Sequence, residues 1–305
     1  MSQYPPAAEP PVSPALTVAP AGRVVSVGRE PEGVAVDPST GVVAVGLRGP
    51  ARLALSTETG VTLGDVRLAG APRHLALAGP GGPFLVPEET VGRLQAVSPR
   101  TRRVVATAVV GVGPHDAVAT GSTWFVGNEF ANTVSVVRGG TEVARFAVAV
   151  QPGGLDVAGP GALAVVAVRQ RVLDLYSTTS FARLARANAG AGPTHVACFG
   201  GYCFVADTGG DALLIFTLAP HLDLVRRLYL PGGPYGMALD PRRHELWVTL
   251  PGVNQLAEVD LDGWRTALQR MWPTVRQANS VGVDDLTGRV FVAGRDDGVL
   301  QIVAP

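Results

Sequence analysis

The stretch GPTHVACF, residues 192–199, is one copy of an eight-residue motif that recurs along this chain. Related phrases begin at Glu30 (EPEGVAVD), Ala71 (APRHLALA), Gly113 (GPHDAVAT), Gln151 (QPGGLDVA) and Gly233 (GPYGMALD), with a weaker copy, QANSVGVD, at Gln277. The second positions of successive copies lie 41, 42, 38, 41, 41 and 44 residues apart. A period near forty predicts a repeat architecture in which each repeat is one supersecondary unit.

Within each period, short apolar runs rich in Val, Leu and Ala alternate with turn residues, which is typical of strands. The third period shows the plan, with strands expected over residues 116–120, 123–129, 133–139 and 142–150. Four antiparallel strands in about forty residues describe one propeller blade. We therefore predict an all-β fold, a seven-bladed β-propeller of four-stranded antiparallel blades.

The two ends of the chain predict how the ring closes. The seventh period supplies three strands, at 280–284, 289–294 and 299–304, and a fourth-strand pattern stands at 23–28, before the first repeat. We expect this N-terminal strand to complete the last blade and remove the open edges of a linear array. The propeller domain then spans 22–305, and the Pro- and Ala-rich residues 1–21 form a disordered tail that buries nothing.

The third period also resembles a known family. TWFVGNEFANTVSVV, residues 123–137, is similar to the YVTN repeat, and the Pro-x-Gly-apolar-Ala-apolar-Asp phrases resemble it too. The resemblance covers about residues 23–305 and implies a seven-bladed propeller. It implies no particular activity, so function has to be argued from the site.

Composition limits the partners. The 305 residues carry no formal net charge, so we expect neither nucleic acid nor an anionic membrane as partner. No secretory signal or membrane-spanning run stands in the sequence, and we expect a cytoplasmic monomer that binds a small molecule or a protein.

Propeller geometry places the repeated phrases around one mouth of the central channel, here called the top face. The polar residues expected there as ligand-binding candidates are Glu32, His74, His115, Asp116, His195, Tyr235, Asn279 and Arg295. Glu88, Glu89 and Glu129, on neighbouring loops, are candidate acids or bases. The remaining histidines, His221 and His244, fall on turns of the opposite face.

Three interpretations of His74, His115 and His195 stay open: solvated loop residues, contacts of an organic ligand, or ligands of a metal. No cofactor is predicted outright, and a divalent metal would need the three rings to converge across a narrow channel, because their blades are not all adjacent. A ligand-binding propeller is the first functional hypothesis. The alternative is an enzyme with lyase- or cyclase-type acid–base chemistry at the same face, although no catalytic motif stands in the chain.

The two cysteines flank a predicted hairpin. In ACFGGYCF, residues 197–204, a Gly-Gly turn makes Cys198 and Cys203 directly opposed partners. A cross-strand disulfide is geometrically possible, but in a cytoplasmic protein we expect two reduced, packed thiols.

Overall fold

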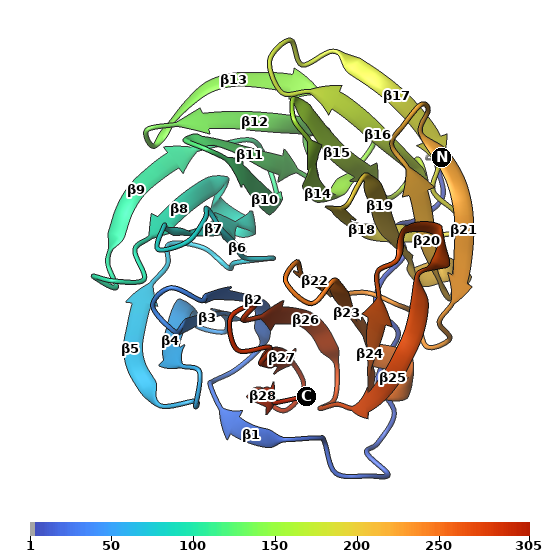
Figure 1. Cartoon of the computed structure of the whole chain (residues 1–305). Helices are drawn as coiled ribbons and strands as arrows, with labels where there is room; N and C mark the ends of the chain where they lie inside the picture. Colours follow the sequence, from blue (N-terminus) through green and yellow to red (C-terminus); the bar gives the residue numbers. More distant parts are fainter. Residues whose placement is uncertain (1–3) are drawn as a thin grey trace.

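Each repeat of the sequence folds into a sheet of its own. In the computed structural model, which describes residues 4–305, these residues form seven four-stranded antiparallel sheets, arranged as blades around a central channel (Figure 1). The predicted all-β, seven-bladed fold is confirmed. Each blade begins with its innermost strand beside the channel and ends with its outermost strand.

The strand bounds follow the repeat. Blade one contains β2 (Pro31–Asp37), β3 (Val42–Arg48), β4 (Ala51–Thr57) and β5 (Thr62–Arg67). Blade two contains β6 (Ala76–Leu77), β7 (Phe84–Glu88), β8 (Arg93–Val97) and β9 (Val104–Val109). Blade three contains β10 (Pro114–Thr120), β11 (Thr123–Asn128), β12 (Thr133–Arg138) and β13 (Thr141–Ala147). Blade four contains β14 (Pro152–Gly159), β15 (Ala162–Ala167), β16 (Val172–Ser177) and β17 (Arg183–Asn188).

The remaining blades keep the same order. Blade five contains β18 (Pro193–Phe199), β19 (Tyr202–Asp207), β20 (Ala212–Thr217) and β21 (Asp223–Tyr229). Blade six contains β22 (Met237–Asp240), β23 (Glu245–Leu250), β24 (Gln255–Asp260) and β25 (Ala267–Pro273). Blade seven contains β26 (Ala278–Val283), β27 (Val290–Gly294), β28 (Val299–Val303) and β1 (Arg23–Ser26). Short 3₁₀ turns interrupt the loops at η1 (Glu89–Val91), η2 (Thr208–Gly210), η3 (Pro251–Val253) and η4 (Gly263–Arg265).

The N-terminal strand closes the ring as predicted. β1 pairs antiparallel with β28, with Arg23 opposite Ile302 and Ser26 opposite Val299. Figure 1 shows β1 beside β28 and the C-terminus. The last blade is therefore built from both ends of the described chain, and its outer edge is the N-terminal strand.

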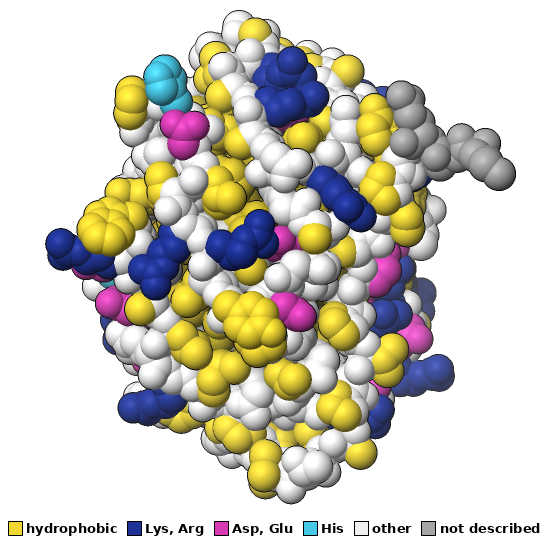
Figure 2. Space-filling view, turned by 90° about the vertical axis from the view of Figure 1, so that its right-hand side faces the viewer, with side chains coloured by type: hydrophobic (Ala, Val, Ile, Leu, Met, Phe, Trp, Pro, Cys, Tyr) yellow, Lys and Arg dark blue, Asp and Glu magenta, His cyan; other side chains and the backbone are white. Residues whose placement is uncertain are grey.

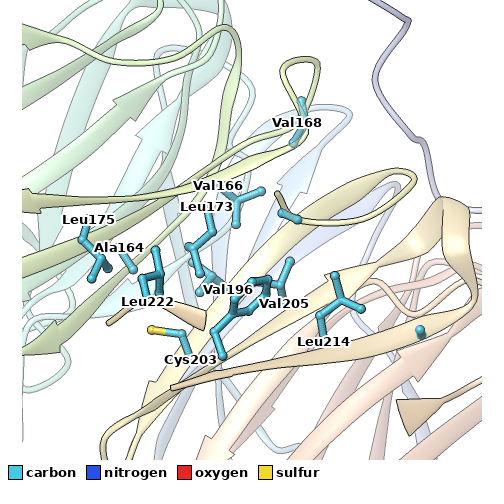
Figure 3. Packing of buried hydrophobic residues seen from close by; sticks show 13 residues of the cluster. Ala164, Val166, Val168, Leu173, Leu175, Val196, Cys203, Val205, Leu214 and Leu222 are labelled. Carbon is cyan, nitrogen blue, oxygen red and sulfur yellow. The ribbon is translucent and has the colours of Figure 1, made fainter. Parts of the chain in front are cut away.

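The core lies between blades. Both faces of a middle strand such as β15 pack on neighbouring sheets, so nearly all of its side chains are buried, whereas the outer strand β13 alternates half-buried and exposed residues. Figure 3 shows one such layer, where Val166 and Leu173 of blade four meet Val196, Val205 and Leu214 of blade five. This packing fixes how closely the innermost strands approach the channel.

The cysteines require a correction. Cys198 and Cys203 are directly opposed across the β18–β19 hairpin, as the sequence predicts, but they form a disulfide instead of two free thiols. Their Cα atoms are only 4.0 Å apart. Direct opposition across a two-residue turn brings the side chains close enough for the bond, so the expected reduced pair is wrong for this structure.

The N-terminal segment differs from the expected disordered tail. Residues 4–22 precede β1 without regular secondary structure, yet hydrogen bonds tie them to the top face. The Ser13 backbone N–H donates to Oε1 of Gln277, and its hydroxyl donates to the carbonyl of Pro251. Nδ2 of Asn254 donates to the carbonyl of Pro14. Ser13 is buried, so the expectation that this segment buries nothing is wrong.

The surface mixes charges. Figure 2, which looks at the side of the ring that lies on the right in Figure 1, shows basic, acidic and single apolar side chains interspersed. This distribution agrees with the formal net charge of zero. Among residues 4–305, no helix has the length and apolar character needed to cross a membrane.

Candidate functional site

Three histidines from three blades meet in the channel. His74 lies just before β6, His115 lies in β10 and His195 in β18, and all three are buried. Nε2 of His195 is 3.0 Å from Nε2 of His74. The ring centroids of His74 and His115 are 4.9 Å apart, and one ring nitrogen of each histidine lies within 4.8 Å of one from each of the other two. The channel is therefore narrow enough for the convergence that the sequence left open.

The glycines that other repeats carry at the position of His74 and His195 explain how the channel becomes narrow. A Cβ on Gly154 would come within 2.8 Å of the Cα of His195, and a Cβ on Gly236 within 2.7 Å of the carbonyl oxygen of Asn279. Where the repeat has glycine, the backbone of a neighbouring blade can therefore lie directly against it. Where it has histidine, the side chain projects toward the centre. The two versions of the phrase thus have different structural roles.

A network of charged groups lies beside the histidines. Nη2 of Arg73 is 2.8 Å from Nε2 of His115, and its guanidinium lies 3.5 Å from a carboxylate oxygen of Glu32 and 3.6 Å from one of Glu89. Arg48 donates to Glu89 at 2.6 Å. Because Glu32 is almost completely buried, Arg73 supplies the countercharge that its carboxylate needs.

Burial and this arginine keep the histidines neutral. Burial is the main cause that lowers the pKa of all three, to about 3 for His195. The positive charge of Arg73 lowers the pKa of His115 and His195 further. At neutral pH the uncharged rings can therefore each accept one hydrogen bond and donate another, or offer a nitrogen to a metal.

Below the histidines the channel opens into a cavity of about 210 Å³. His74 and His195 line it together with Asp116 and Asp156. Burial raises the pKa of Asp116 to about 7 and that of Asp156 to about 6. Each aspartate also accepts a backbone hydrogen bond from the innermost strand of the next blade, from Leu155 and from Cys198 respectively. These carboxyls thus connect blades as well as lining the cavity.

Above the histidines the mouth is covered. Ala7, Ala8 and Glu9 of the N-terminal segment line a space of about 20 Å³ together with Arg73, His115, Glu129, His195 and Tyr235. That volume is about the size of one water molecule. A larger surface hollow of about 470 Å³ lies at the rim beside Arg29 and Asp296, away from the histidines. The histidine cluster thus lies between the small space beside the N-terminal segment and the larger cavity in the channel.

The other predicted residues are distributed around this cluster. Tyr235 is buried with its ring edge against His195, 4.6 Å between centroids, so its ring packs on a histidine. Arg295 lies farther out and contacts Glu32 at 3.4 Å. Asn279 is buried in blade seven, where its side-chain oxygen accepts a hydrogen bond from Gln277. The structure therefore brings together the histidines and Tyr235, links Glu32 and Arg295 through ion pairs, and holds Asn279 by a separate contact.

Some residues gain importance only in three dimensions. Arg73 stands in the repeated phrase next to His74, but only the fold shows that it contacts His115 and two acids. Glu129 lies 4.0 Å from Nε2 of His115, and burial raises its pKa. Glu88, in contrast, accepts the backbone N–H of Gly70 and has a structural contact. Asp156 carried no sequence signal beyond its place in the repeat.

Comparison with known proteins identifies the fold. The chain matches a chain of Kuenenia stuttgartiensis hydrazine synthase with a TM-score of 0.82 at 15% identity, covering 91% of this chain and 96% of that one. It matches a chain of the mitotic checkpoint complex with a TM-score of 0.80 at 13% identity, covering 100% and 97%. It matches the β-propeller domain of Myceliophteria thermophila Cps50 (Swd1) with a TM-score of 0.77 at 10% identity, covering 93% and 100%.

This chain is a seven-bladed β-propeller. At these identities the likeness concerns the fold alone, and the proteins named above differ widely in what their names describe. No known protein-family profile matches the chain, and no curated protein sequence does. Function therefore has to follow from the histidine cluster and its surroundings.

Proposed function

We propose that the propeller binds a small polar or zwitterionic molecule in the channel at His74, His115 and His195. The observation that carries the proposal is the convergence of three buried, neutral imidazoles, two of which, those of His74 and His195, line a cavity of about 210 Å³. Burying three polar rings in the channel lowers the stability of the fold wherever their nitrogens lack a partner, so the arrangement points to a function. Binding sites combine a concave space with a few converging polar groups.

The size and lining of the cavity define the ligand class. Its volume lies below the roughly 300–1,000 Å³ of pockets for drug-sized ligands, which favours a molecule of amino-acid size. The imidazole N–H groups of His74 and His195 can hydrogen-bond a carboxylate, and Asp116 or Asp156 can receive an ammonium group. The covered mouth favours a small molecule over a protein partner at this place.

Asp116 favours a second candidate function. Its carboxyl lines the same cavity as His74 and His195, and its pKa of about 7 suits a group that exchanges a proton at neutral pH. An enzyme of lyase or cyclase type would use these groups on the bound ligand. The blade repeats also support the proposal that the chain is a propeller of the YVTN type.

The test is a binding screen with free amino acids and small dicarboxylic acids, measured by thermal shift and by equilibrium dialysis. A ligand present at 100 times its Kd stabilises the folded chain by about 2.7 kcal/mol. We expect at least one compound to stabilise the wild type and to lose this effect in a His74→Gln, His195→Gln variant. Affinity for an ammonium group should also fall between pH 7 and pH 5, because Asp116, whose pKa is about 7, gains a proton and loses its charge in this range.

The matched controls are His221→Gln and His244→Gln, because both side chains are exposed and belong to other turns of the chain. They should leave binding unchanged. Hydrolysis or elimination of a bound compound, detected by mass spectrometry and lost in Asp116→Asn, would favour the enzyme over the simple binding protein. Binding that survives the double histidine change would refute this location.

A further inference from the structure

We propose that His74, His115 and His195 form a binding site for one divalent transition-metal ion of the zinc type, with an open coordination position toward the channel cavity. The inference deepens the proposed function, because it rests on the same location and assigns the metal as the group that a polar ligand would contact. It can nevertheless be tested with the metal alone. Among residues 4–305, this is the group of His, Cys, Asp and Glu side chains whose ligand atoms converge in this way.

The geometry is close to that of a metal site. Zinc binds imidazole nitrogens at about 2.0–2.1 Å, so two ligands of a tetrahedral ion lie about 3.3–3.4 Å apart. Nε2 of His74 and Nε2 of His195 are 3.0 Å apart, and the three-way spread of ligand atoms is at most 4.8 Å. Side-chain rotations that move the ring nitrogens by a few tenths of an ångström to about one ångström would therefore bring all three within bonding distance of one ion.

Two of the three imidazoles each have one buried nitrogen without a hydrogen-bond partner. Nδ1 of His115 and Nδ1 of His195 are buried and have no hydrogen-bond partner of ordinary geometry. The backbone of Gly153 raises the pKa of His115 and that of Tyr235 raises the pKa of His195, against the larger lowering effect of burial. Metal-bound histidines characteristically donate their second N–H to a backbone carbonyl or carboxylate, which fixes the ring. With an ion on the Nε2 side, the Nδ1–H groups of His115 and His195 would be the ones left to donate to the backbone.

The local charges can accept a dication. The guanidiniums of Arg48 and Arg73 face the carboxylates of Glu32 and Glu89, which offset them. A third carboxylate, Glu129, lies 4.0 Å from Nε2 of His115. It provides the additional negative charge that an ion on the histidines would need. Arg73 would have to release Nε2 of His115, and Glu32 and Glu89 remain as partners for its guanidinium.

The site has the composition of a metal centre that can bind a further ligand. Three neutral imidazoles suit Zn²⁺, Co²⁺, Ni²⁺ or Cu²⁺, and they leave a fourth position for water or a substrate oxygen. His74 and His195 line the cavity of about 210 Å³, so this position can face it. A carboxylate of the ligand class proposed above would fit such a position. The ligands come from three blades, whose packing holds the rings in a common place.

The experiment uses the full chain after dialysis against a chelator. Co²⁺ and Zn²⁺ are added without any organic ligand, and binding is followed by the visible absorption of four-coordinate Co²⁺ and by competition with Zn²⁺. We expect one ion per chain. His74→Gln, His115→Gln and His195→Gln should each weaken binding by about 100-fold or more, since a lost ligand should cost at least as much as a lost outer-shell partner.

Controls keep the result decisive. His221→Gln and His244→Gln should bind the ion like the wild type, and urea melts of every variant report whether it is folded. If one of the three variants His74→Gln, His115→Gln and His195→Gln does not fold, the wild-type chain is measured instead. Its electron paramagnetic resonance spectrum with one equivalent of Cu²⁺ should show coupling to several nitrogens. The metal site is overturned if the wild type does not bind one ion per chain, or if the variants of His74, His115 and His195 bind it as the wild type does. Neither result would affect a ligand found by the organic screen.

Discussion

The ion pair between Arg73 and Glu32 contains the most deeply buried carboxylate of the charged network and should stabilise the site. Glu32 is 1% exposed, and Nη1 of Arg73 lies 3.5 Å from its Oε1. Coulomb's law with an effective dielectric constant of about 20 gives roughly 5 kcal/mol at this distance. Part of that energy is lost to desolvation, and Arg295 still lies 3.4 Å from Glu32 when Arg73 is removed. We therefore expect a measured coupling energy of about 2–3 kcal/mol.

The assay is a double-mutant cycle in urea, with a chelator present in all samples. Arg73→Met should lower the free energy of unfolding by about 3 kcal/mol, because it removes the more buried of the two arginines that face the Glu32 carboxylate. Glu32→Gln should cost about 1–2 kcal/mol. The double variant should cost clearly less than the sum of the two single changes.

The matched control is the surface pair Arg242–Asp285, 3.0 Å apart with 60% and 24% of the two side chains exposed. Arg242→Met with Asp285→Asn should show a coupling energy of at most about 1 kcal/mol. If the Arg73–Glu32 cycle is additive to within about 0.5 kcal/mol, the buried pair does not stabilise the site and the reasoning is refuted.

Three further changes test the fold and the cavity. Deleting residues 1–14 should cost about 1–2 kcal/mol through the lost contacts of Ser13, whereas deleting residues 1–28 also removes β1 and should abolish cooperative unfolding; equal urea midpoints would contradict ring closure by β1. Replacing Cys198 and Cys203 by Ser should lower the free energy of unfolding by about 2 kcal/mol, because the disulfide closes a loop between residues only 5 apart; an unchanged melt would show that the bond does not restrict the unfolded chain. Burial raises the pKa of Asp156 to about 6 from 3.8, so the folded chain keeps a proton that the unfolded chain loses, and the stability due to this group is lost as pH rises from about 4 to about 6. Urea melts at pH 5 and pH 8 should therefore show the wild type losing about 1 kcal/mol relative to Asp156→Asn, and a constant difference would mean that the carboxyl is not perturbed.

The blades were predictable because their signals are local. Alternating apolar runs and turn residues identify the strands of the third period, and the structure places β10 to β13 within a few residues of the expected ranges. Because the last period supplies only three strands, the strand pattern near the N-terminus could be assigned to its fourth position, which is β1. The Gly200–Gly201 turn set the register that opposes Cys198 and Cys203, although the expected redox state was wrong, because register alone does not determine whether the bond forms.

The sequence by itself thus determined the repeat, the seven blades, the closing strand and the position of three histidines at the start of innermost strands. Only the tertiary structure decided that His74 and His195, 121 residues apart, touch at the channel axis. The physical reason is that the channel radius depends on how closely whole blades pack, as where Gly154 lies against the backbone of His195. The same holds for the N-terminal segment, because its composition excludes regular structure but its partners, Asn254 and Gln277, come together only in the folded ring.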